Sequence, residues 1–459
     1  MIYQCHHLEK WANANLDLIE ESLEKGQKAV IIIAGASSSG KSYGSKVIAN
    51  YAEHEGYHVV SFSLDNYNFG LSGIIPNKVN LNYFDGKLEN MPLIRETIKR
   101  IIYNVPFDKK YDKEVLPKIK EALKDIIPSS SLDKFMDALP KEWALLNFDE
   151  PSVYDMAEAA SDIKTLLSGG KVHAKEYSKV VSERVQCDEV LDGSNADVIV
   201  VEGIYALTDD LLEHLKGVNT IKNFIDGNPK SLYLRRIIRD AKTTSADTAF
   251  TTRIYFKYII KSYNEIIYPS SKNADIIFAN EMTFSEMRTG ELFDDRLELK
   301  TKDKSKFEYL LKNSEITEKL YQRDDYFVVN GETEENMNVL RLRTVSYDEG
   351  KTFIPYNLIH KGLKKIRKDG RVIRPINVLV KPGEFDKIWS SEGECLLDFY
   401  RAGFVVGRVI NKLRYNVIYK GQKLKLSDIE TRGYYVDFDE PVNKQIFDEI
   451  KYLFDGDNK

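Results

Sequence analysis

A short segment near the N-terminus constrains the fold of this chain more strongly than any other part of its sequence. The apolar run Val30–Ile33 is typical of a buried strand, and Tyr43–His54 has helical character. Between them lies a stretch that matches the pattern G-x-x-x-x-G-K-[ST]: Gly35, Ala36, Ser37, Ser38, Ser39, Gly40, Lys41 and Ser42. A strand before this pattern and a helix after it predict an α/β domain with a phosphate-binding loop.

The fixed residues of this loop each have a chemical role. Gly35 and Gly40 let the backbone curl so that its N–H groups face a phosphate, and the following helix adds its positive end. Lys41 would reach the β- and γ-phosphate oxygens of a nucleotide such as ATP, and Ser42 would ligate Mg²⁺. The alternative is a glycine–serine turn that binds nothing.

Two carboxylates follow other predicted strands of the same domain. Asp65 lies at the carboxyl edge of the second strand, where it could accept a hydroxyl proton during phosphoryl transfer. Glu202 ends a buried strand, where a carboxylate is costly unless it meets a metal or a hydrogen-bond partner. We expect Glu202 to contact Mg²⁺, directly or through water. The alternatives are a helix cap or surface turn at Asp65 and a purely structural hydrogen bond at Glu202.

Periodicity divides the chain into two folds. We expect an N-terminal helix within residues 1–27 and a parallel-sheet P-loop domain over 28–284, with a helical insertion at about 88–145. Its predicted strands are Ala29–Ala34, His58–Leu64, Ala196–Val201, Thr220–Ile225 and Asp275–Phe278. Residues 285–459 read as a mainly antiparallel β tunnel or barrel. Its predicted strands are Arg296–Thr301, Tyr326–Asn330, Val339–Val345, Phe353–Ile359, Val372–Val380, Phe404–Ile410, Tyr415–Tyr419 and Tyr434–Asp439.

Composition narrows the possible partners. The chain has 66 Lys and Arg against 71 Asp and Glu, a formal net charge of −5, so general nucleic-acid binding is disfavoured. Its 3 cysteines fit neither a zinc site nor a disulfide framework, and we find no signal peptide or membrane-spanning run. We therefore expect a cytoplasmic protein without a membrane partner. The basic run Lys361–Arg374 is typical of a solvated loop, with a phosphate-rich partner as the alternative.

Most of residues 28–280 resemble the uridine kinase/phosphoribulokinase family, with the helical insertion as an interruption. The resemblance rests on IAGASSSGKS, SLDNY, NFDEPSVYD, the tract Tyr177–Arg184, ADVIVVEGIYAL, LRRIIRD and YPSSKNADIIFAN, in that order. It implies that Asp65 is the general base and that Asp149 holds hydroxyl groups of the acceptor. It also implies that Tyr177 and Arg184 line the acceptor pocket, and that a helix and lid over the phosphates carry Arg235, Arg236 and Arg239.

The tract around Tyr177 departs from the family pattern Y-D-F-x-x-H-S-R. Ser178 replaces the acid, and Ser182 replaces the histidine that reads a pyrimidine base. The lid is also reduced, because Lys242-Thr243-Thr244-Ser245-Ala246 contains a lysine but no arginine. The kinase chemistry is compatible with these changes, but uridine as the acceptor does not follow from the resemblance.

The C-terminal region resembles a CYTH domain, the triphosphate tunnel fold, most closely in LSDIETRGYYVDFD. The residues that would line the tunnel are Glu298, Lys300, Arg341, Arg343, Lys361, Lys412, Arg414, Glu430, Asp437 and Asp439. Strand alternation puts Arg341 and Arg343 on one side of a strand, so paired cations would grip a polyphosphate while paired acids hold a divalent metal. The E-x-E-x-K motif is incomplete, with Arg296 in place of its first acid, and Arg374-Pro375-Ile376-Asn377-Val378 carries no acid.

The sequence favours an ATP- and Mg²⁺-dependent small-molecule kinase that transfers the γ-phosphate of ATP to a hydroxyl. Its CYTH-like domain would bind a polyphosphate, a nucleotide or another phosphorylated ligand. The main alternative is a tunnel-type pyrophosphate or triphosphate phosphohydrolase with a regulatory P-loop domain. A nucleotide sensor without turnover, and an inert tunnel scaffold, also stay open. The sequence leaves the acceptor, the oligomeric state and any coupling between the domains undetermined.

Overall fold

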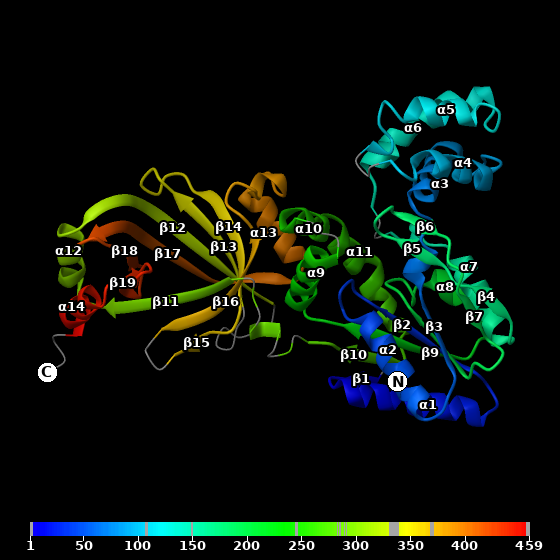
Figure 1. Ribbon diagram of the computed structural model, residues 1–459, viewed down its shortest axis with the longest axis horizontal. Helices are drawn as coiled ribbons and strands as arrows, with labels where there is room; N and C mark the ends of the chain where they lie inside the picture. Colours follow the sequence, from blue (N-terminus) through cyan, green and yellow to red (C-terminus); the bar gives the residue numbers. More distant parts are fainter. Residues whose placement is uncertain are drawn as a thin grey trace. The chain divides into compact units, whose positions relative to one another are not determined.

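The structure is a computed structural model with two compact units (Figure 1). It describes residues 3–105, 109–147, 150–243, 247–281, 283, 286–288, 290, 292–329, 339–367 and 371–455. The first unit comprises Met1–Gly227 and Tyr258–Glu281, and the second comprises Asn228–Lys257 and Met282–Lys459. The segment Asn228–Lys257 lies within the range that the sequence assigns to the P-loop domain, yet it packs as part of the second unit. Within the described ranges, no helix is both long and apolar enough to cross a bilayer.

A six-stranded sheet forms the centre of the first unit. Its strand order is β1 (Tyr3–Cys5), β10 (Ile276–Ala279), β9 (Thr220–Asp226), β2 (Ala29–Gly35), β8 (Val198–Glu202) and β3 (Val59–Ser63). All of its strand pairs are parallel, which confirms the predicted α/β fold. Strand β1 was not predicted, because three residues are too few to establish an alternating pattern.

Helices cover both faces of this sheet, as the apolar strands require. Val30 and Ile32 of β2 belong to a core that includes α7 (Met156–Leu167) and α8 (Asp209–His214). Ile31 and Ile33 belong to a second core, with α1 (Leu8–Glu24) and α2 (Lys41–His54). Successive residues of β2 therefore point into different cores, and all seven residues of the strand are buried.

The helical insertion has a core of its own. It consists of α3 (Leu71–Phe84), α4 (Met91–Ile102), α5 (Leu116–Leu123) and α6 (Ser129–Ala144), so it begins earlier than the predicted residue 88. Two small antiparallel two-stranded sheets follow: β4 (Lys171–His173) with β7 (Val190–Asp192), and β5 (Glu176–Ser178) with β6 (Glu183–Val185). Short helical turns complete the unit: η1 (Leu64–Tyr67), η3 (Pro151–Val153), α11 (Ile260–Ser262), η5 (Tyr263–Ile267) and η6 (Tyr268–Asn273).

The second unit is built on a closed antiparallel sheet, as predicted. In order, its strands are β11 (Leu292–Thr301), β19 (Gly433–Phe438), β18 (Gln422–Ile429), β17 (Phe404–Tyr419), β12 (Glu315–Val329), β13 (Val339–Ser346), β14 (Ile354–Lys361), β16 (Val372–Val380) and the short β15 (Lys365–Ile366). Strand β11 pairs with β19 at one end and with β16 at the other, which closes the barrel. Strand β18 was not predicted, β12 is longer than predicted, and β17 is continuous where two strands were predicted.

Helices surround this barrel. Core residues of α12 (Lys304–Lys312) and α14 (Lys444–Asp455) pack with β17, β18 and β19. The aromatic side chain of Phe256 follows α9 (Pro229–Thr243) and α10 (Thr248–Ile254), in the π-helical turn η4 (Tyr255–Ile259). It stacks on Phe399 of α13 (Glu392–Arg401), with 4.8 Å between ring centroids, and lies 5.6 Å from Trp389. The remaining turns are η7 (Glu286–Arg288) and η9 (Phe385–Lys387).

Candidate active site and a second cationic cavity

The phosphate loop lies between β2 and α2, as its sequence predicts. Gly35 and Gly40 have φ angles of 148° and 99°, which favour glycine. A Cβ atom on Gly35 would collide with the carbonyl oxygen of Ile225, and one on Gly40 would lie 2.5 Å from Asn280 Nδ2. The loop backbone is therefore held in a curled conformation that only glycine permits at these two positions.

Polar groups of this loop point into a buried environment. Lys41 is 8% exposed, and its Nζ donates to the carbonyl oxygen of Ala36 over 2.9 Å. The hydroxyl oxygens of Ser38 and Ser39 are buried and have no hydrogen-bond partner among the described residues. Buried hydroxyls without partners are costly, so oxygen atoms of a bound phosphate would satisfy them. The loop therefore fits a phosphate ligand.

Glu202 lies directly beside the first turn of α2. Ser42 Oγ donates to Glu202 Oε1 over 3.0 Å. Burial raises the pKa of Glu202, and the nearby Asp65 raises it further, while Lys41 opposes this shift. A hydroxyl and a carboxylate oxygen at this spacing are the hard ligands that Mg²⁺ prefers. The residues present therefore fit the metal that a bound nucleotide would bring.

Asp65 is presented at the carboxyl end of β3 by the short turn η1. Ser63 Oγ accepts from the backbone N–H of Asp65 over 3.2 Å and caps this turn. Asp65 is half-buried and acts electrostatically on both Glu202 and Tyr177. Burial raises the pKa of the Tyr177 hydroxyl, which interacts with Ser182. The structure thus brings Asp65, Tyr177 and Ser182 together near the loop.

Arg184 is bonded to the end of the turn that carries Asp65, and its place in the acceptor pocket stays a prediction. Its Nε and Nη2 donate to the backbone carbonyl oxygens of Asn68 and Tyr67 over 2.8 and 2.6 Å, and its Nη1 pairs with Glu158 Oε2 at 2.6 Å. These bonds tie the guanidinium to the end of the η1 turn. Arg184 therefore positions the segment that carries Asp65.

Two residues of this region carry contacts that the sequence reasoning missed. Glu183 is fully buried, and its carboxylate accepts from both the backbone N–H and the hydroxyl of Ser72, over 2.8 and 2.7 Å. This bond links the Tyr177 tract to the first turn of α3. Asn280 Nδ2 donates to the carbonyl oxygen of Ser39 over 2.7 Å. Both residues stand inside quoted motifs, but spacing alone gives them no role.

Four further residues were implied by the family resemblance. Asp149 lies outside the described residues. Arg235 forms a two-point ion pair with Glu286, with its Nε 2.8 Å from Oε1 and its Nη2 3.0 Å from Oε2. Arg236 and Arg239 both donate to Asp240. These arginines lie on α9 and belong to the second unit.

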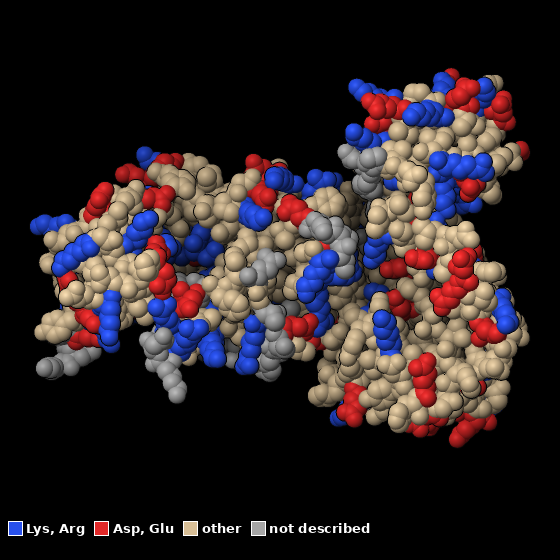
Figure 2. Space-filling view, viewed as in Figure 1, with Lys and Arg blue, Asp and Glu red and all other residues tan. Residues whose placement is uncertain are grey.

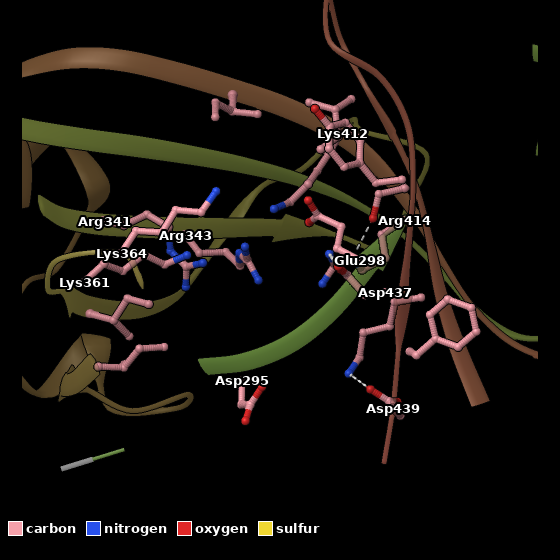
Figure 3. A pocket seen from close by; sticks show the side chains of 18 of the residues that line it. Asp295, Glu298, Arg341, Arg343, Lys361, Lys364, Lys412, Arg414, Asp437 and Asp439 are labelled. Carbon is pink, nitrogen blue, oxygen red and sulfur yellow. Dashed lines mark hydrogen bonds and ion pairs between the residues drawn. The ribbon is translucent and has the colours of Figure 1, made fainter. Parts of the chain in front are cut away.

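A cavity of about 610 Å³ fills the lumen of the barrel. Its basic lining residues outnumber its acidic ones: Arg341, Arg343, Lys361, Lys364, Lys412, Arg414, Lys425 and Arg432 against Asp295, Glu298, Asp437, Asp439 and Glu440. Figure 2 shows basic side chains inside a hollow of this unit. In Figure 3, Arg341, Arg343 and Lys361 gather on one side, with Glu298 and Asp437 across from them. Most of the predicted tunnel residues therefore share one lumen.

Lys300 and Glu430 do not line this cavity, contrary to the sequence expectation. Lys300 lies near the end of β11, where it is exposed and its Nζ stands 5.3 Å from the centre of the Tyr435 ring. Glu430 follows the last residue of β18 and accepts from Asn411 Nδ2 over 3.0 Å. Lys300 is still within β11, where it pairs with Tyr435, and Glu430 lies one residue past the end of β18. Lys425, which the sequence reasoning missed, could have been found from the alternation in KLKLS.

Charges in the lumen are paired across its strands. Arg414 Nη2 lies 3.2 Å from Asp437 Oδ2, and Lys425 pairs with Asp439. Asp324 of β12 is 1% exposed and pairs with Lys412 at 2.7 Å. Burial lowers the pKa of Lys412 to about 7, and a cationic neighbour, Arg343, adds to the shift. The lumen is therefore a desolvated, cation-rich cavity.

Comparison with known proteins identifies the kinase-like region. Residues 109–284 match the model of the "Phosphoribulokinase / Uridine kinase family". The uridine kinase of Ureaplasma parvum is 31% identical over 153 residues, which are 33% of this chain and 67% of that protein. The uridine kinase of Deinococcus deserti is 29% identical over 132 residues, 28% of this chain and 61% of that protein.

The solved structures that resemble this chain share less sequence with it than these relatives do. A putative adenylyl cyclase from Hippeastrum, whose structure is described as revealing a dominant triphosphatase activity, is 11% identical, with a TM-score of 0.26 over 35% of this chain and 86% of that one. The family assignment therefore rests on the sequence relatives. On their identity and coverage, the chain belongs to the phosphoribulokinase/uridine kinase family.

Proposed function

We propose that the first unit is a kinase that transfers the γ-phosphate of ATP to a hydroxyl group of a small molecule, with Mg²⁺ as its metal. The observation that carries this proposal is the contact of Ser42 Oγ with Glu202 Oε1, 3.0 Å long, inside a complete phosphate loop. Family membership supports the same class of reaction. Bound Mg²⁺ would neutralise charge on the transferred phosphoryl group.

Each residue of the site would have a distinct role in phosphoryl transfer. The N-terminal end of α2 and the hydroxyls of Ser38 and Ser39 would bind phosphate oxygens. Lys41 would exchange its bond to the Ala36 carbonyl for the phosphates of the nucleotide. Asp65 would accept the proton of the attacking hydroxyl, at the edge where parallel-sheet proteins bind ligands. Glu202 and Ser42 would hold the metal.

We further propose that the acceptor is not a pyrimidine nucleoside. Ser178 and Ser182 stand where the family pattern has an acid and a base-reading histidine. The Tyr177 hydroxyl interacts with Ser182 and lies within the electrostatic reach of Asp65, so hydroxyl groups gather near the proposed base. Hydroxyl groups suit a polyol or sugar hydroxyl better than the edge of a base.

For the second unit we propose a CYTH-like domain, residues 285–459, that binds a polyphosphate or nucleotide in its lumen. The excess of basic side chains in the 610 Å³ cavity supports binding of a polyanion. The rival activity is hydrolysis of pyrophosphate or triphosphate in this lumen. The pairing of Asp437 with Arg414 and of Asp439 with Lys425 favours binding over hydrolysis, because a metal would have to compete with those cations for the carboxylates.

One experiment distinguishes the proposed kinase from the rival hydrolase. The full chain is incubated with ATP, Mg²⁺ and a panel of nucleosides, sugars and polyols, and ADP and inorganic phosphate are measured separately. ADP formed only in the presence of a particular acceptor supports the kinase. Phosphate released from triphosphate without ATP, at an undiminished rate in Lys41→Ala, would instead establish the hydrolase.

A further inference from the structure

A second cavity of the same unit lies against α9. It has a volume of about 370 Å³ and is lined by Leu234, Arg235, Ile238, Arg239, Lys242, Glu286, His360 and Asn377. No residue is shared between this lining and the lining of the lumen. The α9 cavity is therefore a separate site, and neither the phosphate loop nor the lumen explains it.

Strand alternation puts the α9 cavity on the other side of the barrel wall. In β14, Ile359 and Lys361 line the lumen, while His360 between them lines the α9 cavity. In β16, Ile376 lines the lumen and its neighbour Asn377 lines the α9 cavity. Because successive side chains of a strand point to opposite faces, these two strands form a wall shared by both cavities.

Helix α9 supplies the charge of this cavity. Arg235, Arg239 and Lys242 recur at a spacing of four and three residues, so they lie along one face of the helix. Glu286 is the acidic residue of the lining, and its carboxylate is already engaged by both ends of the Arg235 guanidinium. Arg239 donates to Asp240, which is not part of the lining. The lining is therefore cationic, with Leu234 and Ile238 as its apolar part.

His360 is an unusual residue in this wall. It is 1% exposed, and its Nδ1 lies 3.1 Å from Asn377 Nδ2. An amide nitrogen can only donate, so Nδ1 accepts and Nε2 carries the proton of the neutral ring. Burial lowers the pKa of His360 to about 3, and Lys230 and Arg374 contribute to this shift. Among the described residues, Nε2 has no hydrogen-bond partner, so a buried N–H is left unsatisfied.

We propose that the α9 cavity binds a small phosphate monoester, whose phosphate is held by Arg239, Lys242 and the His360 N–H. Guanidinium groups bind phosphate with strong, charge-assisted hydrogen bonds, and a phosphate oxygen would satisfy the imidazole donor. Leu234 and Ile238 would contact the carbon skeleton of the ester. The volume is at the lower end of the range for small-molecule sites. This site goes beyond the proposed kinase and polyphosphate activities.

The seven histidines of the chain provide a local probe for this site. The full-length protein is labelled with [13Cε1]histidine, and ribose 5-phosphate is added while the ¹H–¹³C spectrum is recorded. His360 is buried, whereas the other six histidines are exposed, so its chemical shift should stay constant between about pH 5.5 and 8. The assignment is checked by the loss of this resonance in His360→Gln. We expect a saturable shift of this resonance with ribose 5-phosphate and none with ribose. Inorganic phosphate should bind at least tenfold more weakly, because it leaves the apolar part uncovered.

Matched variants separate this site from the two other anion sites. Arg239→Gln should weaken binding of ribose 5-phosphate at least tenfold. Arg236→Gln is the matched control, because Arg236 is the other arginine bonded to Asp240 but does not line the cavity. It should change the affinity less than about twofold. Lys41→Ala and Arg343→Ala should leave the shift intact. A His360 resonance that stays fixed at about 10 mM ribose 5-phosphate would overturn the proposal. So would equal binding of inorganic phosphate, equal loss in both arginine variants, or a shift that disappears in Lys41→Ala or Arg343→Ala.

Discussion

Arg343 and Asp324 form a two-point ion pair inside the barrel wall, with Nε 2.6 Å from Oδ1 and Nη2 2.8 Å from Oδ2. Asp324 is also bonded to Lys412 and lies 3.8 Å from Arg341 Nε. Burial would raise the pKa of Asp324, but Arg341, Arg343 and Lys412 outweigh burial and hold it well below its ordinary value. Asp324 therefore acts as an internal anion that keeps three cations in place before a ligand binds.

The first prediction concerns this internal anion. Asp324→Asn leaves three buried cations without their carboxylate, so we expect a loss of about 3–5 kcal/mol in the unfolding free energy of the β domain. Added triphosphate should restore more stability to this variant than to the wild type, because it replaces the missing charge. The measurement is the rise in melting temperature with triphosphate, in a Lys41→Ala background that removes polyphosphate binding by the phosphate loop.

A neighbouring aspartate provides the control for this experiment. Asp325 is fully buried, next in sequence on β12, and bonded to Arg323 rather than to the lumen cations. Asp325→Asn should leave the triphosphate-induced rise in melting temperature at its wild-type size. Equal rises in melting temperature with triphosphate in the wild type, Asp324→Asn and Asp325→Asn would contradict the role given to Asp324.

The second prediction follows from the pKa of Lys412, which is about 7 in the folded protein. Above this pH Lys412 loses its proton, so its contribution to triphosphate binding should fall between about pH 6 and 8.5. Triphosphate itself becomes more negatively charged over the same pH range, which affects every variant. The relevant quantity is therefore the affinity of the wild type divided by that of Lys412→Arg, whose arginine stays protonated. Calorimetry should show this ratio falling as pH rises, and a constant ratio would contradict the prediction.

Linkage fixes the sign of the corresponding effect on stability. The ordinary pKa of lysine is 10.5, so the unfolded chain binds more protons than the folded protein between about pH 7 and 10.5. The contribution of Lys412 to the unfolding free energy without ligand should therefore rise with pH through this window. Lys412→Arg should lack this rise in urea unfolding curves.

The third prediction tests the phosphate loop. Lys41→Ala should lower ATP-dependent phosphoryl transfer by at least about 100-fold, because a cation that stabilises the transferred phosphoryl group is removed. Lys46→Ala is the matched control, since Lys46 is an exposed lysine of the same helix α2 and should keep full activity. Folding is checked by melting temperature. Full turnover in a folded Lys41→Ala protein would separate the kinase reaction from this loop.

The fourth prediction concerns the acceptor. Uridine should be phosphorylated with a kcat/KM below roughly 10⁴ M⁻¹s⁻¹, the lower end of the usual enzyme range. The physical reason is that Ser178 and Ser182 cannot supply the acid and the imidazole that the family pattern places there. Coupled ADP measurements with uridine and cytidine check it. An efficiency above that value with either nucleoside would show that the base is read by other residues.

The fifth prediction tests the assignment of α10 and the turn after it to the β domain. Phe256 is 5% exposed and stacks on Phe399, so Phe256→Ala should cost about 3–5 kcal/mol in the unfolding free energy of that domain. Phe250 on α10 is 53% exposed, and Phe250→Ala should cost less than about 0.5 kcal/mol. Denaturant unfolding of both variants measures the difference. Similar small losses would mean that this aromatic contact does not stabilise the domain.

Some features of this protein follow from its sequence alone. The phosphate loop is local, because two glycines, a lysine and a serine at fixed spacing between a strand and a helix determine the backbone path. The two fold classes also follow from periodicity, because runs of apolar residues and alternating residues bury different faces. Alternation likewise predicts that Arg341 and Arg343 share the lumen.

Other features are decided only by tertiary structure. The resemblance implies a role for Arg184 in the acceptor pocket, but only the tertiary structure shows its three bonds to Asn68, Tyr67 and Glu158. It assigns α9 to the P-loop domain, but aromatic packing next to α10 joins that segment to the barrel. The role of Asp324 likewise depends on cations from two other strands, Arg343 of β13 and the more distant Lys412 of β17. Such partners meet only when strands pair, and no local pattern of residues specifies which long-range neighbour a charged side chain will find.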